Sequence, residues 1–173
     1  MGAEIIFTPE KLVIAVTFSH GIGEHSVWQR LEREFGPIDV YGEPYPFSFT
    51  DYYESEMGTD LTKQLISFER KIDPQTLSAV KRRTNEIEAE SAVNGCRRIN
   101  LDPGILDFNR FILATTKNRG HRIPLTDGIY GELTLLFVRG RFRPFPWTYA
   151  DYRSESVIAD LETIRLTLKS RKK

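Results

Sequence analysis

The pattern of apolar and polar positions predicts a buried strand and a helix in the first part of the chain. Residues 12–18 are apolar on both faces of a two-residue repeat, as expected of a central strand that is covered on two sides. Within residues 24–35 apolar side chains recur at helical spacing, and Gly36 with Pro37 then forms a stop signal. We therefore expect a central strand followed directly by an amphipathic helix.

Two further strands are expected after this helix. Residues 38–41 and 45–49 predict an edge strand, because Pro44 and Pro46 cannot donate hydrogen bonds to a ladder. Residues 61–72 predict a third, longer strand. The sequence thus places an interrupted strand at the border of a sheet.

A second helix and a fourth strand complete the predicted core. Asp73 is a suitable N-cap, Pro74 suits the first helical position, and the helix is expected to continue to Asn94. Residues 98–102 alternate again, which predicts a strand whose polar side chains share one face. The order βαββαβ is that of a ferredoxin-like α+β sandwich, in which two helices cover one face of an antiparallel sheet.

The remaining third of the chain is expected to extend the sheet. Further strands are predicted at residues 108–116, 122–125, 129–138 and 141–145. Asp127 with Gly128 and Arg139 with Gly140 are expected to turn hairpins, and a final helix is expected from Ser154 to residue 169. Since no low-complexity linker interrupts the chain, we expect residues 1–173 to form one domain with a C-terminal hairpin extension and a final helix.

Charge and cysteine content exclude several classes of protein. Lys plus Arg and Asp plus Glu each number 24, so the net charge is zero, unlike that of a dedicated duplex-DNA binder. The single cysteine, Cys96, cannot form an intramolecular disulfide, and three histidines scarcely complete a zinc site. No stretch approaches the roughly 20 apolar residues of a membrane span, and the N-terminus lacks a long apolar region. We expect a cytoplasmic protein with no membrane partner.

Basic side chains on and after the fourth and fifth predicted strands are candidates for an anion pocket. They are Arg98, Lys117, His121 and Arg122. If the two strands are neighbours, these groups could converge on a phosphate or carboxylate through charge-assisted hydrogen bonds. The alternative is a structural network, in which Arg98 pairs with Asp102 or Glu132 and the segment around Gly120 is a solvated turn.

Six carboxylates could serve the same site. They are Asp51, Glu54, Glu56, Asp102, Glu132 and Asp151. Two or three of them could hold Mg²⁺ or exchange protons with a substrate, but their spacing carries no metal signature, so the metal is left open. Glu132 is expected to be half-buried and to need Arg98 or His121 as its cation, with a satisfied structural salt bridge as the alternative. Whether the protein is an enzyme stays open; for an enzyme, His121 or Glu132 is the candidate proton-transfer group.

One row on the second predicted helix could reach the same place. Lys81, Asn85 and Glu88 lie at positions i, i+4 and i+7 and border the apolar stripe of this helix. From there they could extend to a site at the edge of the sheet. A solvent-facing ladder of ion pairs is the alternative.

Aromatic side chains support two rival functions. They are Tyr52, Tyr53, Trp147, Tyr149 and Tyr152. Such rings could stack unpaired bases of single-stranded RNA, although the zero net charge makes nucleic acid the less favoured partner. Residues 147–152 could instead pack on another protein or on a second copy of the chain, which would make this a homodimerisation or interaction module without catalysis.

Several distinctive phrases carry a family resemblance over nearly the whole chain. They are residues 49–53 (FTDYY), 56–58 (EMG), 100–104 (NLDPG), 113–117 (LATTK), 121–123 (HRI) and 147–152 (WTYADY). Together they resemble the bacterial and archaeal family called domain of unknown function 4416, for which no reaction is established. The resemblance implies the following signature positions: Tyr53, Glu56, Lys81, Asn85, Glu88, Arg98, Asp102, Lys117, His121, Arg122, Glu132 and Asp151. Pro124 and Ala150 depart from the tyrosine and proline of the family's usual phrases.

These observations together predict a polar binding site. We expect the protein to bind a small anionic ligand, such as a nucleotide or a phosphorylated metabolite, with Arg98, Lys117, His121 and Arg122 as its ligands. Asp102 and Asp151, with the helical row, are expected to border the same pocket.

Overall fold

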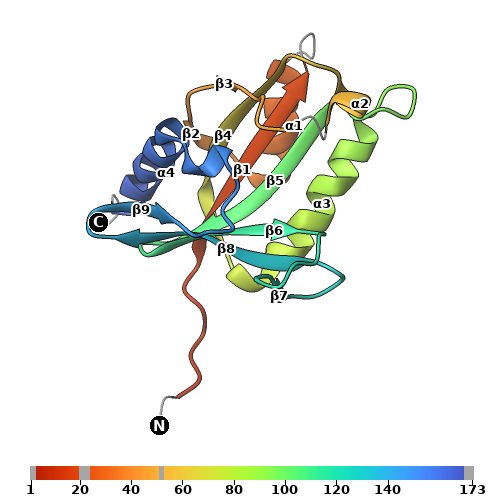
Figure 1. Ribbon diagram of the computed structural model, residues 1–173. Coiled ribbons are helices and arrows are strands. Elements are labelled where there is room, and N and C mark those ends of the chain that lie inside the picture. The colour runs from red at the N-terminus through yellow and green to blue at the C-terminus, as the bar shows by residue number, and fades with distance from the viewer. Residues whose placement is uncertain (1–2, 20–23, 51–52, 170–173) are drawn as a thin grey trace.

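The protein is an α+β structure built on one nine-stranded antiparallel sheet (Figure 1). The computed structural model describes residues 3–19, 24–50 and 53–169. Within them the elements are β1 (Glu10–Ser19), α1 (Glu24–Phe35), β2 (Ile38–Tyr41), β3 (Tyr45–Pro46), α2 (Glu54–Met57), β4 (Leu61–Ile72), α3 (Leu77–Glu90), β5 (Ile99–Leu106), β6 (Arg110–Thr115), β7 (Ile123–Pro124), β8 (Tyr130–Val138), β9 (Arg141–Pro144) and α4 (Glu155–Thr167). Short 3₁₀ turns, Pro74–Thr76 and Asp151–Arg153, precede α3 and α4. No helix in these ranges is long and apolar enough to cross a membrane.

The sheet has the strand order β2-β4-β1-β5-β6-β8-β7, and every neighbouring pair is antiparallel. The short strand β3 also pairs with β4, and β9 pairs with β8. Pro46 thus lies in an edge strand, as predicted, although this strand contains only Tyr45 and Pro46 of the predicted residues 45–49.

The central strand β1 is buried along its whole length, which confirms the prediction made from its two apolar faces. One face packs against α1 and α3, where Ile14 contacts a cluster that includes Leu31 and Ile87. The opposite face packs against α4, where Val13 belongs to a cluster with Leu161. The sheet therefore lies between two helical layers, with the two predicted core helices on the same side.

Local signals in the sequence placed most element ends correctly. Gly36 adopts a positive φ of 96° and its N–H bonds the carbonyl of Glu32, which ends α1. The predicted turns are also confirmed, since Asp127 and Arg139 both take positive φ values directly before a glycine. Ser154 caps α4 by accepting a hydrogen bond from Val157 N.

Several features differ from the prediction. Asp73 caps a 3₁₀ turn rather than the α-helix itself, which begins at Leu77 and ends at Glu90 instead of continuing to Asn94. The fourth core strand is longer than expected, because β5 continues through Pro103 to Leu106. The short helix α2 was not predicted, since a single turn has too few positions to show helical periodicity.

The sheet forks between β5 and β6. These strands pair only where Gly104 to Leu106 face Phe111 to Leu113, so the earlier part of β5 has β1 as its only strand neighbour among the described residues. At Gly104 the two strands approach closely, because an added Cβ would lie 2.6 Å from the carbonyl oxygen of Ile112. Beyond this point β6 turns away from β5, and the space between them is where the candidate site lies.

Candidate functional site

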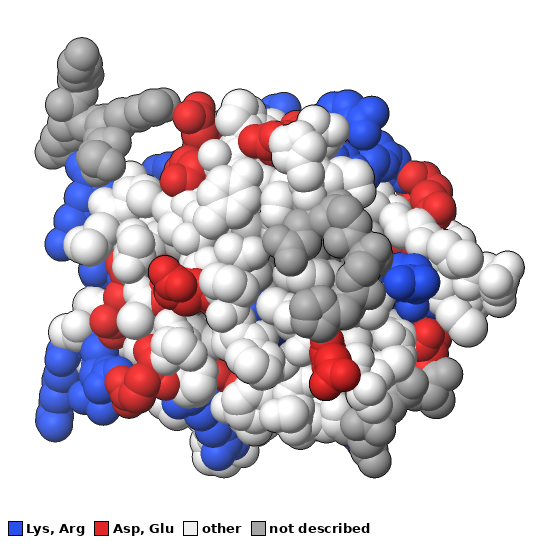
Figure 2. All heavy atoms as spheres, turned by 90° about the horizontal axis from the view of Figure 1, so that it is seen from above, with Lys and Arg blue, Asp and Glu red and all other residues white. Residues whose placement is uncertain are grey.

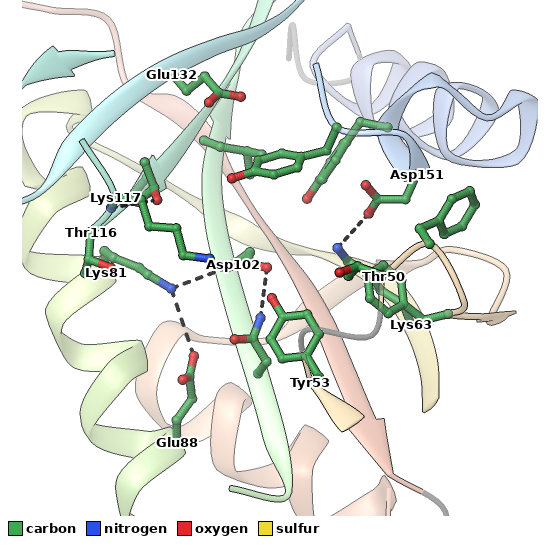
Figure 3. Close-up of a pocket in the computed structure, with 18 of the residues that line it drawn as sticks. Thr50, Tyr53, Lys63, Lys81, Glu88, Asp102, Thr116, Lys117, Glu132 and Asp151 are labelled. Carbon is green, nitrogen blue, oxygen red and sulfur yellow. Dashed lines mark hydrogen bonds and ion pairs between the residues drawn. The ribbon is translucent and has the colours of Figure 1, made fainter. Parts of the chain in front are cut away.

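A pocket of about 560 Å³ occupies the fork of the sheet (Figure 3). Its lining residues are Phe47, Phe49, Thr50, Tyr53, Lys63, Lys81, Asn85, Glu88, Arg97, Asn100, Asp102, Leu113, Ala114, Thr115, Thr116, Lys117, Glu132, Tyr149, Ala150, Asp151 and Tyr152. Ten of them lie on β4, α3, β5, β6 and β8, and the other eleven lie in segments between these elements, including residues 149–152 before α4. Helix and strands thus supply about half of the lining, and connecting segments supply the rest.

The floor of the pocket is made by α3 and the open edge of β5. Lys81 Nζ donates a hydrogen bond to the carbonyl oxygen of Leu101 at 2.7 Å, and the N–H of Leu101 donates to Glu88 Oε1 at 2.7 Å. Both polar side chains are almost fully buried, with 7% and 5% exposed. They satisfy the two backbone groups that a neighbouring strand would otherwise satisfy.

Arg97 connects this floor to α2. Its guanidinium donates to both carboxylate oxygens of Glu56, at 2.7 and 2.6 Å, and to Glu88 Oε2 at 2.9 Å. These hydrogen bonds lower the pKa of Glu56. For Glu88 burial has the larger effect and raises the pKa, although Lys81, the Leu101 N–H and Arg97 oppose it.

Asp102 is the more accessible carboxylate of the floor, with 28% of its side chain exposed against 5% for Glu88. Lys81 Nζ lies 3.4 Å from its Oδ1, and Asn100 Nδ2 donates to its Oδ2 at 2.9 Å. Burial acts to raise the pKa of Asp102, but the charges of Lys81 and Lys63 and these hydrogen bonds outweigh burial and lower it. The floor therefore stabilises a negative charge.

A buried ion pair forms one wall. Lys63 Nζ on β4 lies 2.7 Å from Asp151 Oδ2, and each side chain is only 5% exposed. The same ammonium group lies 4.8 Å from the ring centre of Phe47 and 5.1 Å from that of Tyr152. This pair ties the segment before α4 to the sheet.

Glu132 forms the opposite side of the pocket, where it projects from β8 (Figure 3). Its Oε2 accepts from Arg122 Nε at 2.6 Å and lies 3.0 Å from His121 Nε2. The residue has no exposed surface, and its Oε1 is buried without a hydrogen-bond partner among the described residues. Arg122 also donates to the carbonyl of Lys117 and to the hydroxyl of Tyr149, both at 2.7 Å.

Aromatic side chains also line the pocket, among them Phe47, Tyr53 and Tyr152. Burial raises the pKa of Tyr53 and of Tyr152, and the nearby carboxylate of Asp102 adds to the rise in both. Both phenols are therefore neutral at physiological pH. The Tyr53 ring packs on Phe47, with centroids 5.9 Å apart.

Charges of both signs are balanced at the pocket and on the surface. The lining contains four cations, Lys63, Lys81, Arg97 and Lys117, and four carboxylates, Glu88, Asp102, Glu132 and Asp151. On the face shown in Figure 2, basic and acidic side chains are interspersed, mostly toward the edge of the view. In the part of the chain that the structure describes, no group of three or more His, Cys, Asp or Glu residues is placed to hold a metal ion.

The structure brings most of the predicted site residues together. Eight of them line the pocket: Tyr53, Lys81, Asn85, Glu88, Asp102, Lys117, Glu132 and Asp151. Three more contact lining residues, since Glu56 binds Arg97 and both His121 and Arg122 bind Glu132. The helical row is thus part of the pocket rather than a solvent-facing ladder.

Arg98 is the exception. Its Nε donates to Ser19 Oγ at 3.2 Å, and it borders a separate, open depression together with Cys96 and Asp60. The expectation that Arg98 belongs to the basic set of the pocket and could pair with Glu132 is therefore corrected. Arg122 takes the place of Arg98 beside Glu132, which is fully rather than half buried.

Two pocket cations were missed from the sequence. Lys63 lies on the same face of β4 as Leu61 and Leu65, which are both buried. A lysine at an inward-facing position of a predicted strand was therefore the signal that could have identified it. Arg97 precedes β5, where no alternation yet fixes which way a side chain points. Asp51 lies outside the described residues.

The aromatic residues proposed for RNA stacking do not all lie on one exposed surface, although Trp147 and Tyr149 are 37% and 44% exposed. Tyr152 is only 2% exposed, and Tyr53 lines the pocket. Trp147 stacks on Phe145, with centroids 4.8 Å apart, and its indole N–H donates to a backbone carbonyl. Tyr52, the fifth of the set, lies outside the described residues.

Comparison with known proteins identifies the family and nothing closer. The family model described as "Domain of unknown function (DUF4416)" matches residues 8–167, which is nearly the whole chain. No curated protein matches the chain, and no solved structure matches it. The matched range includes every residue of the pocket. The chain therefore belongs to the DUF4416 family.

Proposed function

We propose that the pocket binds a small anionic metabolite, such as a nucleotide or a phosphorylated sugar. The observation that carries the proposal is that four cationic side chains, Lys63, Lys81, Arg97 and Lys117, line the pocket, where Lys81 and Lys63 already stabilise the negative charge of Asp102. Lys117, an exposed residue just after β6, points into the same pocket (Figure 3). A ligand phosphate beside these ammonium groups would gain charge-assisted hydrogen bonds.

The size and walls of the pocket support a ligand of this class. Its volume of about 560 Å³ falls within the range of roughly 300–1,000 Å³ that is typical of small-molecule sites. The rings of Phe47, Phe49 and Tyr53 provide an apolar surface for the uncharged part of a ligand. Mg²⁺ is commonly bound by one or two carboxylates together with substrate phosphates, and Asp102 is the more accessible carboxylate of the floor.

Thermal unfolding of the purified chain tests the proposal. Nucleoside monophosphates, ribose 5-phosphate and inorganic phosphate would be titrated with and without Mg²⁺, and a bound ligand should raise the Tm with its concentration. Lys117→Met removes an exposed cation from the pocket and should weaken binding about tenfold. Lys71→Met is the matched control, because Lys71 is exposed on β4 and does not line the pocket.

Two results would contradict the proposal. One is that none of these compounds raises the Tm of the wild-type chain. The other is that Lys117→Met and Lys71→Met bind the same compound with equal affinity.

A ferredoxin-like core is the fold interpretation that accompanies this proposal. Its support is the order β2-β4-β1-β5 with antiparallel pairs throughout, and the packing of α1 and α3 on one face of β1. On this interpretation β6 to β9 and α4 are additions, and the pocket lies at the junction between core and addition.

A further inference from the structure

One carboxylate of the pocket, Glu132, has an oxygen atom that lacks a hydrogen-bond donor among the described residues. Glu132 faces Leu113 in the β6–β8 ladder and lines the pocket across from Asp102 (Figure 3). Arg122 Nε and His121 Nε2 both approach the same oxygen, Oε2, at 2.6 and 3.0 Å. The other oxygen, Oε1, has no hydrogen-bond partner among the described residues and is shielded from solvent.

The neighbours of Glu132 make it a fixed acceptor. A guanidinium group keeps its proton at any physiological pH, so the short contact with Arg122 is made by an ionised carboxylate. An ionised carboxylate oxygen accepts hydrogen bonds and cannot donate one. Leaving such an oxygen buried without a donor costs about 1–3 kcal/mol or more. The contacts on Oε2 also hold the side chain in place, so a ligand can donate to Oε1 only when it displaces the neighbours that shield this oxygen from solvent.

We infer that Oε1 of Glu132 accepts a hydrogen bond from a ring N–H or an amino group of the ligand, and that this contact determines which ligand binds. The inference rests on the proposed function and narrows it to anionic metabolites with an N–H donor. Nucleotides carry such donors on their bases. In this role Glu132 is a specificity residue, and His121 and Arg122 are positioning residues that hold it.

Glu132→Gln tests the inference because it reverses the polarity of one atom. Arg122 can only donate, so the amide oxygen of glutamine must take the place of Oε2. The amide nitrogen then replaces Oε1 and presents a donor where the wild-type protein presents an acceptor. The shape of the pocket stays nearly the same.

Matched pairs of nucleotides provide the readout. Adenosine and inosine 5′-monophosphate exchange donors and acceptors at two ring positions, as do cytidine and uridine 5′-monophosphate. We expect the wild-type chain to prefer one member of a pair by about tenfold to 100-fold, and Glu132→Gln to prefer the other. Isothermal titration calorimetry measures both affinities.

Glu10→Gln is the matched control. Glu10 is also a buried carboxylate with an arginine partner, since Arg110 Nη2 lies 2.7 Å from its Oε1, and its Oε2 also lacks a partner among the described residues. Glu10 does not line the pocket. The control should therefore keep the wild-type ranking.

The possible outcomes separate the two proposals. If nucleotides bind but Glu132→Gln keeps the wild-type ranking, the inference is overturned and the proposed function stands. If no nucleotide binds the wild-type chain, the inference is overturned, and the proposed function is overturned as well when ribose 5-phosphate and inorganic phosphate also leave its Tm unchanged. If the glutamine variant does not fold, Glu132→Asp provides a second test, because it withdraws the carboxylate by one methylene. This variant must lower the affinity for the preferred nucleotide at least about tenfold more than the affinity for the other member of the pair. Equal loss of affinity for both nucleotides would overturn the inference.

Discussion

The ion pair between Lys63 and Asp151 should be one of the strongest single couplings in the fold. Both side chains are 5% exposed and their charged atoms are 2.7 Å apart, so removing either partner leaves the other charge buried and uncompensated. Such a loss costs about 3–5 kcal/mol, whereas replacing both partners with apolar side chains is often close to neutral. We expect Lys63→Met and Asp151→Leu each to lower the free energy of unfolding by this amount, and the double variant to recover most of it.

Urea unfolding followed by circular dichroism measures these free energies. At about 2–4 °C per kcal/mol for a chain of this size, each single variant should lose roughly 6–20 °C in Tm. Arg141→Met is the control, because Arg141 and Glu155 are also 2.7 Å apart but 35% and 83% exposed, and their pair should contribute less than about 1 kcal/mol. The reasoning is refuted if the single variants cost no more than this control, or if their effects simply add in the double variant.

Two further predictions concern the fork and its floor. Gly104→Ala places a methyl group 2.6 Å from the backbone oxygen of Ile112 and should lower the free energy of unfolding in urea by about 2 kcal/mol. Gly131→Ala is the control, because its nearest contact is a side-chain atom at 3.6 Å, and it should cost less than about 1 kcal/mol. Equal costs would contradict the close approach of the two strands. The lowered pKa of Asp102 means that its stabilising contribution is present above its unfolded pKa of 3.8 and is lost as pH falls through its folded pKa. Asp102→Asn should therefore be less stable than wild type at neutral pH and approach it as the pH falls below 3.8 and through the lowered folded pKa. A stability difference that does not change with pH would exclude this ionic role.

Elements with strong local signals could be predicted from the sequence. The limits of α1 and β4 match the predicted ranges, because apolar periodicity and a glycine stop are properties of neighbouring residues. The sheet order could not be derived in the same way beyond β5. The fork depends on how far β6 stays paired with β5, which is decided by packing between distant segments rather than by either strand alone.

The candidate site shows the same division. Asn100 and Asp102 were predicted to share a face, and the structure places both in the pocket. Arg98 is two residues before Asn100 and was expected on the same face. It precedes the first residue of β5, however, so the alternation of the strand does not determine where its side chain points. The contact between Arg122 and Glu132 was missed because it depends on a turn whose geometry no sequence pattern specifies. Self-association stays a prediction, which sedimentation tests.

The backbone N–H and C=O of Leu101 bond to two side chains of α3, Glu88 and Lys81, in place of a neighbouring strand. Lys81 and Glu88 are consequently needed by the architecture whether or not a ligand is bound. A change of ligand chemistry during evolution would then be confined to lining residues outside this floor, such as those of the segment that carries Phe47 and Phe49, while the base of the cavity stays constant. Family members that differ in what they bind should differ there first.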